Sequence, residues 1–509
     1  MAAYRAVIAF GCARAIREPA EKRRAIDAFI NRLYPGACIR GRSGVRRPPT
    51  DQHVKATSFV TMPIEPAAPV ANDQGAPHRI VIVGGGAAGL ELATALGARY
   101  GRRGLADITL IDSARTHLWK PMLHAVAAGS LDRSGEELNY LAHAHRHHYR
   151  FDFGELVGLS RAEKHVSLAE MQDDEGRTIT PARDIAYDTL VIAIGSVTND
   201  FGTPGAAKYA VPLENVDQAS RFHRRVVNAC IRAQTQVAPV RPGQLYIAIV
   251  GGGATGTELS AELSRTVRQV VATGLDRIHP DNDIRITLIE ATPRILPALP
   301  ERVAVATERL LVKMGIEVRA GARVTEIGAD FVRFADGSEI ASELVVWAAG
   351  VKGPDVLRDL DGLEANRNNK LIVLPTLQTT RDPNIFAIGD CTECPIEGSP
   401  LPVPPRAQAA HQQAAHMVAQ IGRRFAGQEL EPYRYRDFGS LVSLGRYSTV
   451  GSLMGLMGPS FFIEGLVARM MYRFLHVMHE YELHGALRVI EDVIARTLLR
   501  RKERIVKLH

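Results

Sequence analysis

Apolar and polar positions along the chain predict two copies of one strand–turn–helix unit. In the first copy, the β-branched run 79–83 ends in the glycines of 84–89, and apolar residues then recur at helical spacing. The same order returns over 245–263. Each copy is followed by a second apolar run that ends in an acid, Asp112 in the first and Glu290 in the second. The pattern predicts an α/β protein with two Rossmann-like dinucleotide-binding domains.

Each copy places glycines where a nucleotide phosphate requires them. Gly84 makes the tight turn, Gly86 lets the backbone approach a pyrophosphate, and Gly89 permits close packing of the helix on the strand. The N-terminus of that helix then faces the phosphates with unpaired N–H groups and its positive dipole end. The corresponding glycines of the second copy are Gly251, Gly253 and Gly256.

The acid after each copy is expected to hold a ribose hydroxyl group. Asp112 lies at about the usual spacing from its glycines, whereas Glu290 lies farther along, and "TGLDRIHPDND" at 273–283 looks like the insertion responsible. A carboxylate at Glu290 also repels a 2′-phosphate, so NADH is preferred to NADPH. Two dinucleotide sites on one chain suggest a permanent flavin in one and a visiting nicotinamide in the other.

The composition is that of an ordinary globular protein. With 509 residues, of which 46% are hydrophobic and 23% charged, the chain can form two or three domains. The net charge of +7 favours an anionic partner, which could be a nucleotide, an acidic lipid surface or nucleic acid. No stretch approaches the roughly 18 apolar residues of a membrane-spanning helix. The five cysteines are few and irregularly spaced, which argues against a disulfide framework and for a reducing compartment.

The first 75 residues differ from the rest. Residues 1–50 contain eleven Arg and Lys but three acids, as in a basic arm or an Arg-rich leader. The Pro-rich stretch "MPIEPAAPVANDQGAPHR" that opens at Met62 could equally mark the start of a shorter protein. We expect residues 1–75 to be a disordered or mis-started basic extension outside the fold.

The two copies resemble the two-dinucleotide-binding flavoprotein superfamily, in which a nicotinamide domain is inserted into the flavin domain. "YDTLVIAIGS" (187–196) and "ELVVWAAG" (343–350) are similar to its interdomain links, and "TTRDPNIFAIGD" (379–390) to its late return to the flavin. The resemblance implies that Asp390 lies beside the flavin ribitol. It also implies an FAD-binding domain made of 78–200 and 350–433 and an NADH-binding domain of 201–349.

Cysteine placement separates members of this superfamily. Disulfide reductases carry a redox cysteine pair, and no cysteine lies between Asp112 and Gly129. Cys391 and Cys394 could be a redox pair or half of a metal site, but a single CxxC is weak evidence for zinc. The pair also follows Asp390 rather than facing the nicotinamide. Sulfide:quinone oxidoreductases need catalytic cysteines at positions that are not filled here.

Four stretches resemble the bacterial type II NADH:quinone oxidoreductases, and the resemblance extends from Arg79 to His509. The stretches are "HLWKPMLHAVAAGSLD" (117–132), "GSVTNDFGTPG" (195–205), "PRAQAAHQQA" (405–414) and "GSLVSLGRYSTVGSLMG" (439–455). In that family the third stretch lines the quinone pocket beside the isoalloxazine. Helical spacing puts Gln408 and Gln412 on one face, where they offer neutral donors to quinone carbonyls. Alone, these glutamines could equally form a polar helix face.

The resemblance implies an activity in which hydride passes from NADH to FAD and two electrons then reduce a membrane quinone without proton pumping. Glu258 is expected near the nicotinamide and flavin rings, where it orients NADH or relays a proton. An acid in the first turn of a helix also suits the helix dipole, without any role in the reaction. The residues expected to act in the reaction are Glu258, Gln408 and Gln412.

The resemblance also implies contacts with both cofactors. FAD contacts are expected from Gly84, Gly86, Ala87, Ala88, Gly89, Asp112, Lys120, Gly195, Gly389, Asp390, Ala407 and Gln408. NADH contacts are expected from Gly251, Gly253, Ala254, Thr255, Gly256, Glu258, Glu290 and Gly350. No metal site is expected, because the histidines at 143, 145, 147 and 148 have no acidic or cysteine ligand beside them and suit a solvated basic face.

The C-terminal region has an amphipathic pattern. From Phe461 to Tyr481 and again from Leu487 to Leu498, apolar residues recur at helical spacing with charged residues opposite the first stripe, and a basic end follows. Residues 434–509 are therefore predicted to be a membrane-anchoring region, in which these two amphipathic helices attach the protein peripherally to an anionic membrane at the cytoplasmic face of the inner membrane. A helix pair that covers a core or forms a dimer would give the same pattern. We expect a homodimer, which is compatible with membrane attachment.

Two other classes stay open. A soluble ferredoxin or rubredoxin reductase also has two dinucleotide sites but would lack the amphipathic tail and the glutamine pair. A non-enzymatic flavoprotein resembling apoptosis factors would bind nucleic acid through its basic surface, whereas a quinone reductase predicts no nucleic-acid partner.

Overall fold

The computed structural model divides the chain into two compact units, Met1–Ala68 and Pro69–His509. In the first unit, β1 (Arg14–Ala15) pairs with β2 (Val60–Thr61) in antiparallel register, and the rest of the predicted extension up to residue 74 lies outside the described residues. The residues that the structure describes are 14–15, 60–61, 75–131, 133, 136–444, 448–453, 461–464, 470, 477 and 483.

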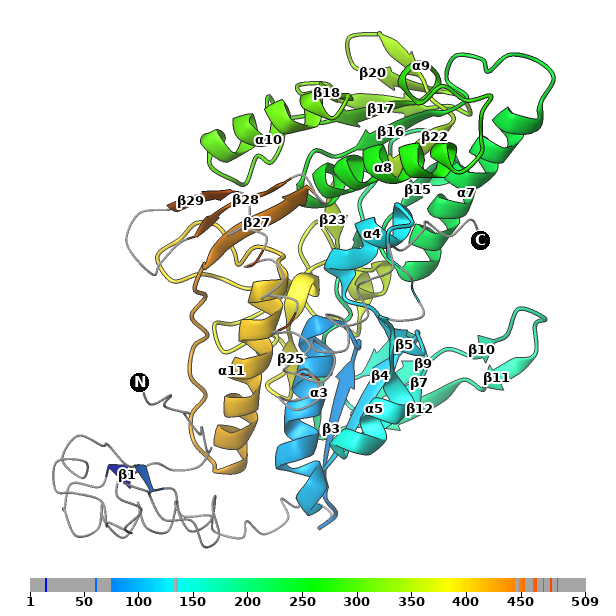
Figure 1. The fold of residues 1–509 in the computed structure, drawn as a ribbon. Helices are drawn as coiled ribbons and strands as arrows, with labels where there is room; N and C mark the ends of the chain where they lie inside the picture. Colours follow the sequence, from blue (N-terminus) through cyan, green and yellow to red (C-terminus); the bar gives the residue numbers. More distant parts are fainter. Residues whose placement is uncertain are drawn as a thin grey trace, which may run out of the picture. The chain divides into compact units, whose positions relative to one another are not determined.

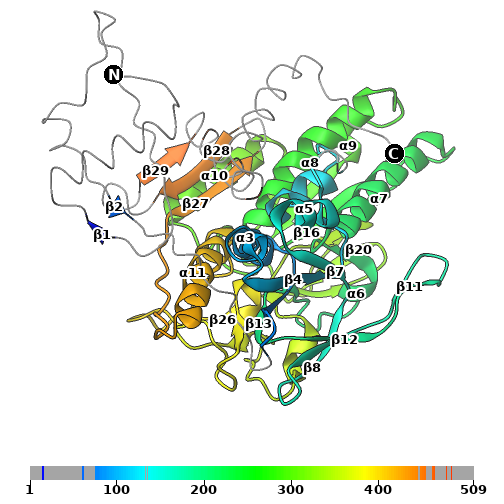
Figure 2. The same ribbon diagram turned by 90° about the horizontal axis from the view of Figure 1, so that it is seen from below.

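A five-stranded parallel sheet forms around the first glycine motif (Figure 1). Its strand order is β25-β13-β3-β4-β7. The bounds are β3 (His78–Val83), β4 (Ala106–Asp112), β7 (Arg150–Phe153), β13 (Thr189–Ile192) and β25 (Ile385–Ala387). All four residues of β13 are buried, as a parallel sheet covered by helices requires. Helices α3 (Ala87–Arg99) and α11 (Ala407–Phe425) pack side by side, which Figure 2 shows from below.

A second five-stranded parallel sheet interrupts the first in sequence, between β13 and β25. Its order is β15-β22-β16-β17-β18. The strands are β15 (Ala210–Pro212), β16 (Tyr246–Val250), β17 (Arg285–Ile289), β18 (Ile316–Arg319) and β22 (Leu344–Trp347). The long helices of this part are α7 (Val216–Thr235), α8 (Ala254–Ala272) and α10 (Glu301–Lys313). The prediction of two parallel-sheet dinucleotide folds is confirmed.

Short elements complete these two folds. The links between them pair as β14 (Val197–Thr198) with β23 (Val351–Lys352). One small antiparallel sheet contains β8 (Leu156–Ser160), β9 (His165–Leu168) and β12 (Arg183–Ala186). A second consists of β10 (Met171–Gln172) and β11 (Thr178–Thr180). A third contains β19 (Val324–Ile327), β20 (Phe331–Phe334) and β21 (Glu339–Ala341). Further pairs are β5 (Thr116–His117) with β6 (Leu138–Asn139) and β24 (Leu371–Ile372) with β26 (Thr392–Glu393). The short helices are η1 (Gly101–Arg103), η2 (Lys120–Met122), α4 (Leu123–Ala127), α5 (Tyr140–His147), α6 (Ala206–Tyr209), α9 (Pro280–Asp283), η4 (Asp355–Asp359) and η5 (Gly389–Cys391).

The α4 helix belongs to one fold by sequence and to the other by packing. It follows β4 of the first sheet, yet it contacts α7 and α8 of the second fold. Leu123, Val126 and Ala127 are buried in the same apolar core as Leu259 and Leu263 of α8. This packing carries polar residues of α4 into the boundary between the two folds.

The C-terminal region begins as a sheet, which corrects the prediction of helices from Phe461 onward. β27 (Gly439–Leu444), β28 (Ser448–Leu453) and β29 (Phe461–Glu464) form a three-stranded antiparallel sheet, and β27 packs against α8. The apolar positions near Phe461 fit helical spacing, but the aromatic and β-branched run at 461–463 pairs with β28 instead.

Beyond this sheet, the structure describes three helical residues. Met470 is 62% exposed, whereas Leu483 is buried. The remaining positions of both predicted apolar stripes beyond residue 464 lie outside the described residues. Among the residues that are described, no helix combines the length and apolar character needed to cross a bilayer.

Candidate functional site

The two glycine motifs adopt the same backbone geometry. Gly84 and Gly251 have φ values of +104° and +114°, a region that favours glycine. A Cβ at Gly89 would overlap the carbonyl oxygen of Gly84, and a Cβ at Gly256 would overlap that of Gly251. Each helix therefore approaches its own turn closely only because these positions are glycine.

The N-termini of α3 and α8 have the space and the donors that a phosphate needs. Gly86 and Gly253 are the N-cap residues, and a glycine has no side chain to cap the free N–H groups of the first turn. A Cβ built at either glycine would meet no described atom within 4 Å. The first helical residues behind them are Ala87, Ala88, Ala254 and Thr255. The residues present thus fit a dinucleotide pyrophosphate at each motif.

The acid after each second strand bonds the middle glycine of its own turn. Asp112 accepts hydrogen bonds from the backbone N–H groups of Gly85 at 2.5 Å and Ala114 at 2.7 Å. Glu290 accepts from Gly252 at 2.9 Å and Thr292 at 2.8 Å. Burial raises the pKa of Asp112, although these bonds and Lys120 act in the opposite direction. The insertion before Glu290 does not alter this geometry.

Two side chains behind the first turn were not indicated by the sequence pattern. The Tyr140 hydroxyl donates to the carbonyl oxygen of Gly85 at 2.6 Å, and His117 Nδ1 lies 3.0 Å from the same oxygen. Both side chains are buried. They come from α5 and β5, so no local motif could have associated them with the glycine turn.

Lys120, Gly195 and Asp390 come together at one end of the first sheet. Lys120 Nζ donates to the Ser196 carbonyl at 3.2 Å, and the Ser196 hydroxyl donates to Asp390 Oδ2 at 3.2 Å. Gly195, before Ser196, lies next to Lys120 Nζ. The N–H of Gly389 donates to the buried Gln413 side chain at 2.6 Å, so α11 fixes the turn that carries Asp390.

Glu258 is buried where three parts of the fold meet. Its Oε2 lies 3.3 Å from Nδ1 of His124 on α4, and its Oε1 accepts the backbone N–H of Ser443 on β27 at 2.8 Å. Burial, opposed by the Ser443 bond and reinforced by Glu262, raises the pKa of Glu258 to about 8. Burial lowers the pKa of His124. Sequence reasoning indicated Glu258 but not His124.

Gln408 and Gln412 lie on one face of α11, but both amides bond the segment that follows the helix. Gln408 Nε2 donates to Asp437 at 3.2 Å and to the Gly439 carbonyl at 3.0 Å. Gln412 donates to the Arg436 carbonyl at 2.8 Å and accepts the Arg436 N–H at 3.0 Å. Both N–H groups of Gln408 are thus used within the chain, whereas Gln412 makes one donor bond to the described residues.

An open hollow of about 710 Å³ lies beside this face of α11. Gln412 and His416 line it from the helix, and Tyr433 and Phe438 line it from the segment 431–438. Phe438 is half exposed. The hollow combines these rings and the Gln412 amide with the charged residues Glu431, Arg434 and Arg436, so its lining is mixed rather than purely apolar.

The cysteine pair and His143 are buried within the fold, where their surroundings suit a structural role. Cys391 and Cys394 are buried, and burial raises the pKa of each thiol to about 12, so both stay protonated at neutral pH. His143 lies 2.8 Å from the Tyr149 hydroxyl and 3.0 Å from the Leu483 carbonyl oxygen. In the described part of the chain, no three His, Cys, Asp or Glu residues are grouped to hold a metal ion.

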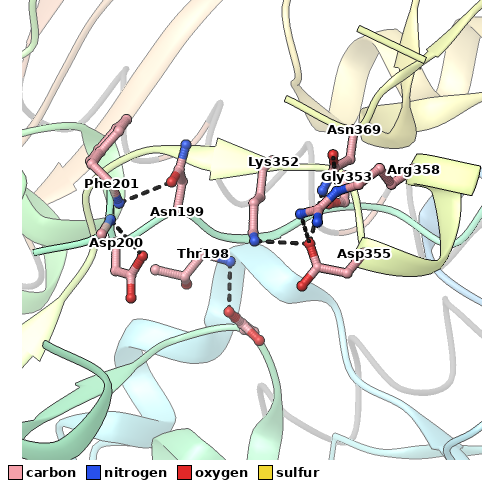
Figure 3. Close-up of polar contacts among 11 residues, drawn as sticks. Thr198, Asn199, Asp200, Phe201, Lys352, Gly353, Asp355, Arg358 and Asn369 are labelled. Carbon is pink, nitrogen blue, oxygen red and sulfur yellow. Dashed lines mark hydrogen bonds and ion pairs between the residues drawn. The ribbon is translucent and has the colours of Figure 1, made fainter. Parts of the chain in front are cut away.

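The links between the folds are held by a network of polar contacts (Figure 3). Oδ1 of Asp355 accepts hydrogen bonds from Lys352 at 3.0 Å, Arg358 at 3.2 Å and Asn369 at 2.9 Å. Gly350 has φ of +67°, and a Cβ there would overlap the ring of Phe201 on the other link. The two links therefore constrain each other.

Comparisons with known proteins agree with this architecture. A family model described as pyridine nucleotide-disulphide oxidoreductase matches residues 78–414. The type II NADH:quinone oxidoreductase of Haemophilus influenzae is 41% identical over 443 residues, which are 84% of this chain and 99% of that protein. The type II NADH:quinone oxidoreductase NdhA of Mycobacterium tuberculosis is 30% identical over 416 residues, 78% of this chain and 84% of that protein.

A solved structure supports the fold. The structure of NDH2 from Plasmodium falciparum in complex with NADH matches with a TM-score of 0.70 at 18% identity, covering 84% of this chain and 99% of that chain. The family inferred from the four sequence stretches is confirmed: the chain belongs to the type II NADH:quinone oxidoreductases of the pyridine nucleotide-disulphide oxidoreductase family.

Proposed function

We propose that this chain oxidises NADH and reduces a membrane quinone through bound FAD, without pumping protons. The observation that carries the assignment of FAD and NADH is the pair of matching cradles, each with a helix that starts at an uncapped glycine and an acid bonded to the turn. The similarity to type II NADH:quinone oxidoreductases supports quinone as the acceptor. FAD, when bound, accepts hydride from NADH and passes two electrons to the quinone. The residues of the chain bind and orient these partners.

FAD is assigned to the first cradle. The first turn of α3 faces the pyrophosphate, and Asp112 is placed for a ribose hydroxyl. Lys120, Gly195 and Asp390 line the continuation towards the ribitol and ring, because they lie together at the end of the same sheet. The remaining proposed FAD contacts are Gly84, Gly86, Ala87, Ala88, Gly89, Gly389, Ala407 and Gln408.

NADH is assigned to the second cradle. Glu290 sits at the ribose position, where a carboxylate repels the 2′-phosphate of NADPH. Glu258, just beyond the first turn of α8, orients NADH or relays a proton towards the quinone. The remaining proposed NADH contacts are Gly251, Gly253, Ala254, Thr255, Gly256 and Gly350.

The quinone is assigned to the face of α11 that carries Gln408 and Gln412. Gln412 offers a neutral donor at the edge of the hollow, and Phe438 offers an apolar ring. Gln408 contributes by holding the segment 436–439 in place, since its own donors are used there. The protonated thiols of Cys391 and Cys394 favour direct electron transfer to quinone over disulfide chemistry.

The C-terminal residues beyond Glu464 are assigned to peripheral attachment at the cytoplasmic face of an anionic membrane. The exposed apolar side chain of Met470 supports this assignment, because it belongs to the predicted apolar stripe. A homodimer stays a prediction.

The test is NADH oxidation by the purified yellow protein with a short-chain quinone or with ferredoxin as acceptor. Fast turnover with quinone is expected. If NADH bleaches the flavin but only an iron–sulfur protein reoxidises it, a soluble ferredoxin or rubredoxin reductase is indicated instead. Failure of NADH to bleach the flavin, combined with tight binding of nucleic acid, would favour the apoptosis-factor class.

A further inference from the structure

The contact between His124 and Glu258 joins the two predicted cofactor sites. Glu258 lies two residues after Gly256, just beyond the first turn of the nicotinamide cradle helix. His124 lies one helical turn after Lys120, whose Nζ bonds the Ser196 carbonyl at the flavin end of the first sheet. The pair therefore spans the boundary between the two folds.

The two oxygens of Glu258 have different partners. Oε1 accepts the Ser443 N–H at 2.8 Å, so this oxygen acts as an acceptor. A proton on the carboxyl group is therefore carried by Oε2, which lies 3.3 Å from His124 Nδ1. The imidazole also donates to the Pro121 backbone carbonyl. In the neutral tautomer that leaves Nδ1 unprotonated, Nδ1 can accept the Glu258 proton in a hydrogen bond.

The surroundings of the pair contain few other charges. From α8 itself, Glu262 faces the pair and forms an ion pair with Arg265. From α7, which packs against α4, His223 lies beside Gly129, two residues after α4 ends. Strands β16 and β17 beneath α8 present buried apolar side chains, and β27 presents the uncharged Ser443 N–H.

We propose that His124 is a positioning residue for the quinone reaction: its Nδ1 holds the Glu258 carboxyl so that Oε2 gives up its proton to the reduced quinone. The inference rests on the role proposed for Glu258. In the step, NADH supplies two electrons through FAD, the Oε2–H bond breaks, and an O–H bond forms on one quinone oxygen. Glu258 is left as a carboxylate and takes a proton back from water, while the second quinone proton comes from solvent.

Both groups are suited to this exchange at neutral pH. Their side chains are only 9% and 7% exposed, for His124 and Glu258 respectively. Burial lowers the pKa of His124 and raises the pKa of Glu258 to about 8, which keeps the imidazole neutral and the carboxyl protonated near pH 7. A carboxyl with a pKa near the working pH can both donate and recover a proton.

The first measurement is an infrared spectrum of the flavin-loaded protein at neutral pH. A carbonyl band of a protonated carboxyl is expected, and its loss in Glu258→Gln assigns it. In His124→Leu the band should move to higher frequency because the carboxyl loses its acceptor. In His124→Gln it should move less, since an amide oxygen is a weaker acceptor than an imidazole nitrogen but still accepts.

The second measurement separates the half-reactions in stopped flow. In His124→Leu, reoxidation by quinone should slow about tenfold or more, because the proton donor is misplaced, while reduction by NADH stays within roughly twofold of the parent rate. His124→Gln should restore part of the reoxidation rate. His145→Leu, at an exposed position on α5, is the control and should change neither measurement.

The outcomes distinguish this inference from the proposed role of Glu258. If Glu258→Gln reoxidises at the parent rate, that role fails, whatever His124 does. If Glu258→Gln is slow but His124→Leu keeps both the parent band and the parent rate, the inference about His124 is overturned. If His124→Leu does not fold, the band in His124→Gln decides, and an unmoved band overturns the inference.

Discussion

Glu290 Oε2 accepts the backbone N–H of Gly252 at 2.9 Å, so the acid that we propose for the nucleotide ribose also fixes the glycine turn of its own cradle. Asp112 has the same relationship to Gly85 in the first cradle. A substitution that removes the charge but keeps an acceptor oxygen therefore separates nucleotide selectivity from the integrity of the turn.

Glu290→Gln should raise the KM for NADH and improve the use of NADPH. The amide oxygen can still accept from Gly252, but the repulsion of the 2′-phosphate is lost. The ratio of kcat/KM for NADPH to that for NADH should rise by about tenfold. Steady-state kinetics with both nucleotides measure this ratio, and Glu301→Gln on α10 is the control. An unchanged ratio in Glu290→Gln would count against the assignment of the second cradle.

Asp390→Ala should deplete bound flavin. The carboxylate accepts from Ser196, which in turn holds Lys120, so its loss disturbs the group of side chains expected around the ribitol. The ratio of flavin absorbance to protein absorbance in the purified variant measures occupancy. Asp359→Ala, an exposed acid on η4, should keep full occupancy. A fully yellow Asp390→Ala protein would show that Asp390 does not hold the flavin.

Sequence alone predicted the elements whose signals are local. The glycine turns, their acids and the cradle helices follow from residues within one strand–turn–helix unit, because the backbone geometry itself demands glycine there. The contacts of His117 and Tyr140 with the Gly85 carbonyl could not be predicted, because both side chains come from elements that are distant from the glycine turn in sequence. The contact of His124 with Glu258 could not be predicted either, because it depends on α4 packing into the core of the other fold. The spacing of apolar residues along the chain does not indicate that packing.

The strand at Phe461–Glu464 shows a different limit. A short apolar run that fits helical spacing can also form a strand, and here pairing with β28 decides between the two structures. The glutamines of α11 illustrate a third limit. Their spacing predicts a shared face, but it does not reveal that the segment 436–439 already uses most of their hydrogen-bonding groups.

Gln412→Leu should slow the reaction with quinone and spare the reaction with NADH. The substitution removes the amide at the edge of the hollow and the two bonds to Arg436, so both the quinone donor and the segment beside it are altered. Stopped-flow traces of each half-reaction measure the effect, and about a tenfold loss in reoxidation is expected. Gln428→Leu, beyond the end of α11, is the control. Equal losses in both half-reactions would contradict a quinone-specific site.

Glu258→Gln should change how stability depends on pH. The pKa of Glu258 is raised from 4.5 to about 8 in the fold, so between these values the folded protein binds a proton that the unfolded chain releases. The free energy of unfolding therefore falls as pH rises through this window, by about 5 kcal/mol at most. Glu258→Gln lacks this loss, so its Tm should rise relative to the parent between about pH 6.5 and 8.

The window for this comparison starts at pH 6.5 because His124 acts in the opposite sense below it. The fold lowers the pKa of His124 below 6.5. As pH falls below 6.5, the unfolded chain therefore binds a proton at this histidine more readily than the folded protein, and the free energy of unfolding decreases. Glu301→Gln should follow the parent across the whole range. A constant difference in Tm between Glu258→Gln and the parent would mean that Glu258 is already ionised at neutral pH.

A chain that ends after Glu464 should leave the membrane yet still oxidise NADH with a small artificial acceptor. The cut keeps β29, which pairs with β28, and removes the predicted amphipathic region. Each cation near an anionic surface contributes about 1 kcal/mol to binding. Burial of apolar side chains at the interface adds to this, so the predicted tail should bind tightly but reversibly. High salt should therefore release the intact protein only in part, whereas detergent should release it fully. Turnover with a long-chain quinone in vesicles should fall far more than turnover with a soluble analogue.

The cut also removes Leu483, whose carbonyl oxygen lies 3.0 Å from His143 Nε2, so some loss of thermal stability is expected for a reason unrelated to the membrane. His143→Phe in the full chain is the control, because it breaks this contact, together with the one to the Tyr149 hydroxyl, and leaves the tail in place. An unpaired buried polar group costs about 1–3 kcal/mol, so both proteins should show a fall in Tm. Only the truncated chain should lose vesicle binding. If the truncated chain still sediments with anionic vesicles, attachment lies elsewhere, and a change in native mass on truncation would assign the tail to a dimer interface.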